Sequence, residues 1–163
     1  MRTCHESRKL EYPIFRMPTI WDSTARADLL RRYDKLNDQS RPQWGKFTVG
    51  RMVRHCADGV RMATGELAVK PKPGPFRNWL VGKLIIYVMP WPKGAPTAPE
   101  LLSVDDPALD VSRSELRAAL DRLVAIGPDG SLAEHAAFGK LSGKDWGVLA
   151  YRHLDHHLTQ FGV

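Results

Sequence analysis

Apolar residues recur at the three- and four-residue spacing of an α-helix in four separate segments, and no segment carries a clear strand pattern. Each segment opens on residues that cap helices and closes on glycine, proline or a polar turn. The pattern predicts helices over about 22–37, 48–65, 112–127 and 142–161. Four amphipathic helices in a chain of 163 residues indicate an all-α fold, and we predict a four-helix bundle.

Polar residues mark where three of the predicted helices begin. Ser142 and Asp145 form the pattern of a capping box at the start of the last helix, and Ser112 and Glu115 form the same pattern at the start of the third. Thr48 is the predicted N-cap of the second helix.

The connection between the second and third helices, residues 67–110, is far longer than an antiparallel turn requires. From Leu67 to Pro99 it contains five basic residues, no acidic residue and seven of the twelve prolines. An apolar run from Asn78 to Met89 predicts a short buried helix inside it, which the following prolines end. We therefore predict a crossover connection, with the second and third helices not simple up-and-down neighbours.

Charge and composition limit the classes of partner and compartment. The net charge is +6, but no nucleic-acid motif accompanies the basic segment, so it is either a solvated connection or a docking surface and nucleic acid is not favoured. No apolar run approaches the roughly 20 residues that span a membrane, so no membrane partner is expected. With two cysteines in no pairing pattern and no leader-like segment, we expect a cytoplasmic protein.

One domain is expected over residues 1–163, with residues 1–20 as an N-terminal extension. The sequence leaves a homodimer open as an oligomeric state.

Three of the six histidines lie within five positions of the predicted last helix. On a wheel of about 100° per residue, His157 lies inside the apolar arc and His153 at its edge, whereas His156 lies about 60° towards the polar face. Two inward imidazoles at i, i+4 can both bind one metal ion. Hydrogen-bonded core histidines would give the same pattern.

A third inward histidine lies on the second predicted helix. His55 falls within the apolar arc of that helix, so three imidazoles from two helices favour a metal site of His55, His153 and His157. Cys56 lies about 100° from His55 on the wheel, and we interpret it as a small core residue.

Three blocks of sequence carry a resemblance to a known superfamily: WGKFTVGRMVRHCADGVRMATGE, MPWPKGAPTAPELL and FGKLSGKDWGVLAYRHLDHHLTQFG. From about Trp21 onward the chain resembles the DinB/YfiT-like superfamily of metalloenzymes, in particular a bacterial branch with no assigned function. The resemblance implies a four-helix bundle with a long crossover. Its metal motif, a histidine on the second helix and H-x-x-x-H-x-x-Q on the last, falls on His55, His153 and His157, followed by Gln160.

Three neutral imidazoles leave a divalent ion with its full charge and with open positions for water or substrate. Zinc and nickel are the expected metals. The resemblance implies a transferase that activates the thiol of a small cosubstrate, or a hydrolase, acting on a small molecule. The alternative is a non-catalytic helical module in which the ion serves structure or sensing, while the basic segment docks a partner.

Two further residues are candidates for acid–base chemistry. Asp58 lies about 60° from His55 on the same helix and could act as a base, orient a ligand, or be a solvated helix residue. His135, just before the last helix, could be catalytic or could hold its own loop. We also expect the segment from Leu67 to Pro99 to cover the histidines and to present Lys83 or Lys93 to an anionic substrate.

Overall fold

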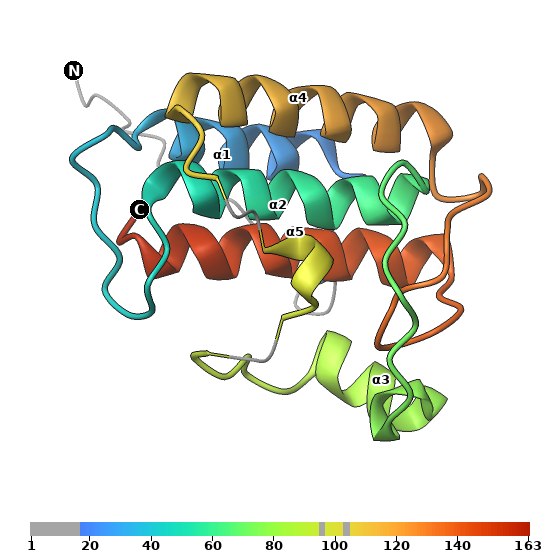
Figure 1. Cartoon of the computed structure of the whole chain (residues 1–163). Helices are drawn as coiled ribbons and strands as arrows, with labels where there is room; N and C mark the ends of the chain where they lie inside the picture. Colours follow the sequence, from blue (N-terminus) through green and yellow to red (C-terminus); the bar gives the residue numbers. More distant parts are fainter. Residues whose placement is uncertain (1–16, 95–96, 103–104) are drawn as a thin grey trace, which may run out of the picture.

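The computed structural model of the chain describes residues 17–94, 97–102 and 105–163, and within these residues it is helical (Figure 1). The α-helices are α1 (Ser23–Asp34), α2 (Val49–Thr64), α3 (Trp79–Tyr87), α4 (Leu109–Ile126) and α5 (Gly143–Gln160). No strand occurs in the described ranges, where His135 and Gly139 form an isolated bridge. The predicted all-α class is confirmed, and residues 1–16 of the predicted extension lie outside the described part.

The four long helices, α1, α2, α4 and α5, lie side by side, and α3 lies outside them (Figure 1). α2 and α4 run in the same direction, and α5 runs in the opposite one. The chain can join two parallel helices only by returning along their length, and the segment that carries α3 makes this return. The predicted crossover between the second and third long helices is therefore confirmed.

α2 occupies the centre of this arrangement and packs against both α4 and α5. Eleven of its sixteen residues are buried, which explains why apolar residues cover a wide arc of its helical wheel. The core that it shares with its neighbours is built from large apolar side chains that are almost fully buried, among them Tyr33, Met52, Val53, Leu116, Leu120, Leu154 and Leu158.

Local signals set the ends of two helices as predicted. The Thr48 hydroxyl accepts from the backbone N–H of Arg51 at the start of α2, and Gly65 ends this helix with φ of 80°, a conformation that favours glycine. At the start of α5, Ser142 and Asp145 form the predicted capping box with both reciprocal hydrogen bonds.

The predicted capping box at Ser112 and Glu115 is wrong. The N-cap of α4 is Ala108, four residues before Ser112, and Ser112 is fully buried inside the helix. Packing overrides the local signal, because the start of α4 lies so close to α2 that a methyl group on Gly50 would be 2.1 Å from the Pro107 carbonyl oxygen. Glu115 instead pairs with Arg54 of α2.

The prediction of a buried short helix is also wrong. α3 forms as expected, with the Asn78 side chain capping its start, but only Gly82 and Ile86 are buried in it. Polar contacts attach α3 to α5: Lys83 and Tyr87 both bind the Asp145 carboxylate. Arg152 of α5 reaches the carbonyl groups at the other end of α3, donating to those of Ile85, Ile86 and Met89.

The chain joins the packed helices before Trp21, because Ile20 is fully buried and its backbone N–H donates to the Gly147 carbonyl. None of the described helices combines the length and the apolar character that crossing a membrane requires.

Candidate metal centre

Three imidazole rings from two helices meet in the interior: His55 from α2, and His153 and His157 from α5. One ligand atom from each ring can be chosen so that all three atoms lie within 4.8 Å of one another. The Nε2 atoms of His55 and His153 are 3.0 Å apart, and the three ring centroids are 4.8 to 4.9 Å from one another. The structure thus brings together the three histidines that the wheel and the family motif select.

Hydrogen bonds to oxygen fix the tautomer of two of these rings. The Nδ1 atom of His55 lies 2.9 Å from the Leu101 carbonyl oxygen, and that of His157 lies 2.8 Å from Oε1 of Gln160. Since both partners can only accept, each Nδ1 carries the proton and each Nε2 keeps its lone pair. Gln160 is oriented in turn by its Nε2, which donates to the Trp44 carbonyl at 2.8 Å.

Burial keeps the three imidazoles neutral. It lowers the pKa of His55, although the hydrogen bond to Leu101 opposes this shift. Burial lowers the pKa of His157 to about 3, with a further contribution from His55. The pKa of His153 lies well below its ordinary value because of burial and the neighbouring histidines. Neutral imidazole is the form that binds a metal ion.

Aromatic rings and one glycine enclose the site. Phe47 stacks on His55 at a centroid distance of 5.3 Å, and Trp91 lies 6.1 Å from His153. A methyl group on Gly59 of α2 would be 3.1 Å from the His153 ring, so this ring lies directly against the α2 backbone.

The contacts of Trp91 confirm that the segment from Leu67 to Pro99 reaches the histidines. Of its two candidate lysines, Lys83 pairs with Asp145. Lys93 lies over the Trp44 ring, with its Nζ 4.4 Å from the centroid. A substrate contact by either lysine stays a prediction.

The sequence was compared with models of known protein families, with curated proteins and with solved structures. Residues 21–162 match the family model described as "Protein of unknown function (DUF1569)". The chain belongs to the DUF1569 family. Comparisons with curated proteins and with solved structures found no match.

In this DUF1569 chain, the His156 ring lies beside the cluster, with its centroid 5.3 Å from that of His157. It is partly buried between Trp44 and Trp91, whose ring centroids are 5.8 and 6.0 Å away. It does not belong to the ligand group that the described residues form.

Asp58 is buried, so its interpretation as a solvated residue is wrong. Its carboxylate accepts from Arg54 and Arg61, and both arginines also pair with Glu115 of α4. This network of ions joins α2 to α4. A role for Asp58 in acid–base chemistry stays a prediction.

His135 holds its own loop, which was one of the two interpretations of this residue. Its Nδ1 accepts from the backbone N–H groups of Ala137 and Phe138, and its ring packs against Trp146. Burial lowers its pKa to about 4. A catalytic role for His135 stays untested.

Cys56 lies in the core of the DUF1569 fold, as predicted. Burial raises the pKa of its thiol to about 12, and its sulfur accepts from the Tyr33 hydroxyl at 3.1 Å. A buried thiol with a raised pKa is a poor nucleophile, which agrees with a structural role for Cys56.

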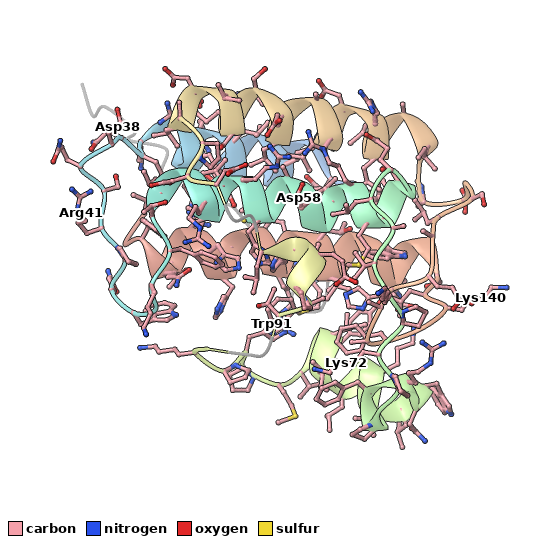
Figure 2. The ribbon with its side chains drawn as sticks, in the orientation of Figure 1. Asp38, Arg41, Asp58, Lys72, Trp91 and Lys140 are labelled. Atoms are coloured by element: carbon pink, nitrogen blue, oxygen red, sulfur yellow. The ribbon has the colours of Figure 1, made fainter. Side chains whose placement is uncertain are left out.

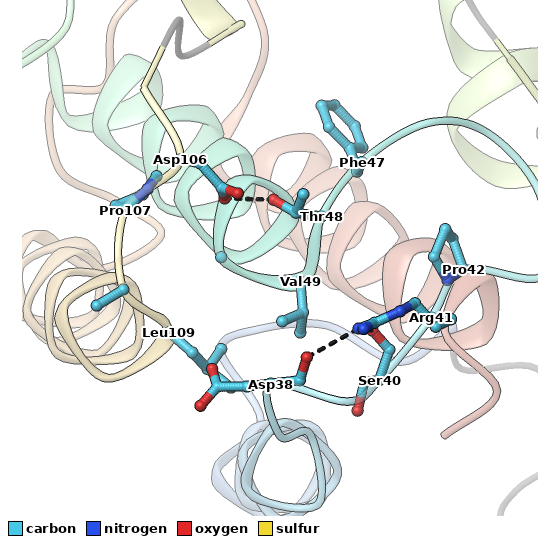
Figure 3. A pocket seen from close by; sticks show the side chains of 12 residues that line it. Asp38, Ser40, Arg41, Pro42, Phe47, Thr48, Val49, Asp106, Pro107 and Leu109 are labelled. Atoms are coloured by element: carbon cyan, nitrogen blue, oxygen red, sulfur yellow. Dashed lines mark hydrogen bonds between the residues drawn. The ribbon is translucent and has the colours of Figure 1, made fainter.

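A cavity of about 450 Å³ lies at the start of α2, and none of the described histidines lines it (Figure 3). Phe47 lines this cavity and also stacks on His55. Thr48 and Asp106 are hydrogen-bonded across its wall.

Sequence reasoning missed the groups that surround the histidines. The acceptors at Leu101 and Trp44 are backbone carbonyls, which every residue carries, so no sequence signal distinguishes them. Phe47 and Trp91 are visible as aromatic residues, but both lie outside the two helices that carry the histidines, so helical periodicity does not place them at the site.

Proposed function

We propose that this DUF1569 protein is a metal-dependent enzyme whose divalent ion, zinc or nickel, is held by His55, His153 and His157. The observation that carries the proposal is the convergence of the three imidazoles, two of which have their Nε2 lone pairs set by Nδ1 hydrogen bonds. Histidine ligands in proteins are typically fixed in this way by a carbonyl or an amide oxygen behind them.

The donor set fits a catalytic ion better than a structural one. Structural zinc sites are closed by four protein ligands, whereas catalytic sites use three and keep a position open. Within the described residues, the group of possible ligands has three members. Such an ion, when bound, would lower the pKa of a water or a thiol, or polarise a carbonyl.

The resemblance to the DinB/YfiT-like superfamily, with its four-helix bundle, supports this proposal and suggests a transferase that uses a small thiol, or a hydrolase. Cys56 does not suit the role of this thiol, because it is buried and has its pKa raised to about 12, and we propose that a small cosubstrate supplies it. The aromatic side chains of Phe47 and Trp91 would limit water at the histidines.

Metal binding by four purified variants tests the ligand set. His55→Ala, His153→Ala and His157→Ala should each weaken metal binding by orders of magnitude, because two imidazoles cannot fix the ion. His156→Ala should bind like the wild type and serves as the matched control. Metal content after dialysis, and calorimetric titration with Zn²⁺ or Ni²⁺, measure this. Loss of binding in His156→Ala with retention in His157→Ala would sink the assignment.

The burial of His55 and His157, which are 4% and 8% exposed, favours the alternative of a non-catalytic metal module. The visible spectrum of the Co²⁺-loaded protein separates the two functions, because it reports ligand exchange at the ion. Added small thiols should change the spectrum if a position is open. A tetrahedral spectrum that no thiol or anion alters would support the non-catalytic module.

A further inference from the structure

α3 is apolar on two opposite faces. Gly82 and Ile86 face the bundle side, where α3 packs against α5. Leu80, Leu84 and Val88 follow one another at four-residue spacing on the opposite side, and they are 62%, 46% and 69% exposed. An apolar helix face is normally covered, and none of the described residues covers the outer face of α3.

Further exposed apolar side chains lie at both ends of the helix. Trp79 is 74% exposed at the start of α3, and Phe76 and Met89 are each 46% exposed beside it. We call this group the α3 patch: Phe76, Trp79, Leu80, Leu84, Val88 and Met89. Clustered exposure of this kind marks an interaction surface, whereas single exposed apolar residues do not.

Two lysines lie near α3, beside the ion pairs of Arg77 with Glu134 and of Lys83 with Asp145. Lys140, together with Phe76 and Trp79, lines a hollow of about 230 Å³ beside the helix. Lys72 lies in the stretch that leads to α3, and Figure 2 shows both lysines. No ion pair is found for Lys72 or Lys140 among the described residues, and the chain from Leu67 to Pro99 contains no acidic residue. A partner that is both apolar and anionic would complement this surface.

We propose that the α3 patch docks on the surface of an anionic phospholipid bilayer. The side chains of Leu80, Leu84 and Val88 would enter the boundary between headgroups and acyl chains, with Trp79 at headgroup depth, where indole rings are favoured. The nearby lysines would contact lipid phosphates. This peripheral contact needs no spanning helix, so it agrees with the lack of one in the described part.

Size and charge argue against other occupants. α3 has nine residues and is therefore about 14 Å long, which gives a face far smaller than the roughly 800 Å² per partner of a stable protein interface. A symmetric dimer through this patch would bring the unpaired lysines of both copies to one interface. A bilayer is continuous, so it sets no minimum on the size of the contact.

Co-sedimentation of the full chain with vesicles tests the proposal, using phosphatidylcholine alone and phosphatidylcholine mixed with phosphatidylglycerol. We expect binding to the mixed vesicles, weak binding to the neutral ones, and a decrease as salt screens the lysines. Leu84→Glu and Leu80→Glu should each weaken binding about tenfold or more, because a charge replaces a buried apolar side chain. Both side chains are exposed, so the variants should fold.

Val111→Glu on α4 is the matched control, because it also replaces an exposed apolar residue with the same charge and should bind like the wild type. Lack of binding to the mixed vesicles, or equal weakening by Val111→Glu, would overturn the proposal. So would a wild-type dimer in sedimentation velocity that Leu84→Glu dissociates, which would identify a second copy as the occupant. The test does not depend on the metal site.

Discussion

At the scale of single residues, the histidine cluster is organised by groups that would not touch an ion. Gln160 links the His157 ring to the Trp44 carbonyl, and the Leu101 carbonyl orients His55. These contacts select one tautomer before any ligand arrives, so the site loses little conformational freedom on binding.

Replacing Gln160 by leucine should weaken metal binding by about 10- to 100-fold, the usual effect of removing such a support. The reason is that His157 would lose the acceptor that keeps its proton on Nδ1. Gln160→Glu retains an acceptor and should lose less affinity. Calorimetric titration measures both, with the exposed Gln39→Leu as control. Equal affinity in Gln160→Leu and the wild type would show that the tautomer does not limit binding.

Gly59→Ala should separate metal affinity from stability. The added methyl group would lie 3.1 Å from the His153 ring, so the ring must shift by a few tenths of an ångström. We expect metal affinity to fall about tenfold. The metal-free protein should be no less stable, because alanine favours a helix over glycine by about 1 kcal/mol. Chemical unfolding with a chelator present measures the second effect, and a large loss of stability there would contradict the prediction.

At the scale of elements, α3 is attached to the long helices mainly by polar contacts rather than by a full apolar face. Asp145 binds Lys83 and Tyr87 near the middle of α3, and the Arg152 guanidinium donates to three carbonyls at its end. Since the last carbonyls of a helix have no partner within it, Arg152 acts as a cap supplied by another helix.

Arg152→Met should loosen the end of α3 while it leaves the aliphatic packing of this side chain in place. We expect faster amide hydrogen exchange in residues 87–93 than in the wild type, with little change in α2 and α4. Mass spectrometry of the exchanged peptides measures this effect. Arg31→Met, which removes an exposed arginine of α1, is the control. Unchanged exchange at the end of α3 would mean that Asp145 alone holds the helix.

The sequence predicts the start of a helix correctly where residues within one turn of the chain determine it. The capping box of Ser142 and Asp145 acts within one turn, so it could be recognised in the sequence. Ser112 presents the same local pattern, but the packing of α4 against α2 decides where that helix starts. The apolar run of α3 predicts a helix correctly and its burial wrongly, because periodicity does not reveal what covers each face. Likewise, the wheels select His55, His153 and His157 but not the carbonyl groups that orient them.

At the scale of the whole molecule, the loop before α5 should make stability depend on pH. The pKa of His135 is about 4 in the folded protein because of burial, and about 6.5 in an unfolded chain. Above pH 6.5 the residue is neutral in both states. As the pH falls from 6.5 to 4, only the unfolded state takes up this proton, so up to about 3 kcal/mol of unfolding free energy is lost.

His135→Asn isolates this effect, because an asparagine oxygen can accept the same two backbone N–H groups without titrating. The variant and the wild type should have similar stability at pH 8, and the variant should be the more stable at pH 5. Urea unfolding with a chelator present measures both. Stability curves that stay parallel between these pH values would contradict the prediction.

The long crossover separates His55 from the other two histidines along the chain, which limits how an unfolded chain could bind a metal ion. His153 and His157 are four positions apart, whereas His55 and His153 are separated by 98 residues. In an unfolded chain the first two can meet by forming one helical turn, but the third must be brought in by closing a long loop, at an entropic cost that only the packing of α2 against α5 overcomes. An ion would therefore bind weakly to the unfolded chain and tightly to the finished fold. Capture of the third imidazole would then report, in a refolding experiment, the moment at which the two distant halves of the chain dock.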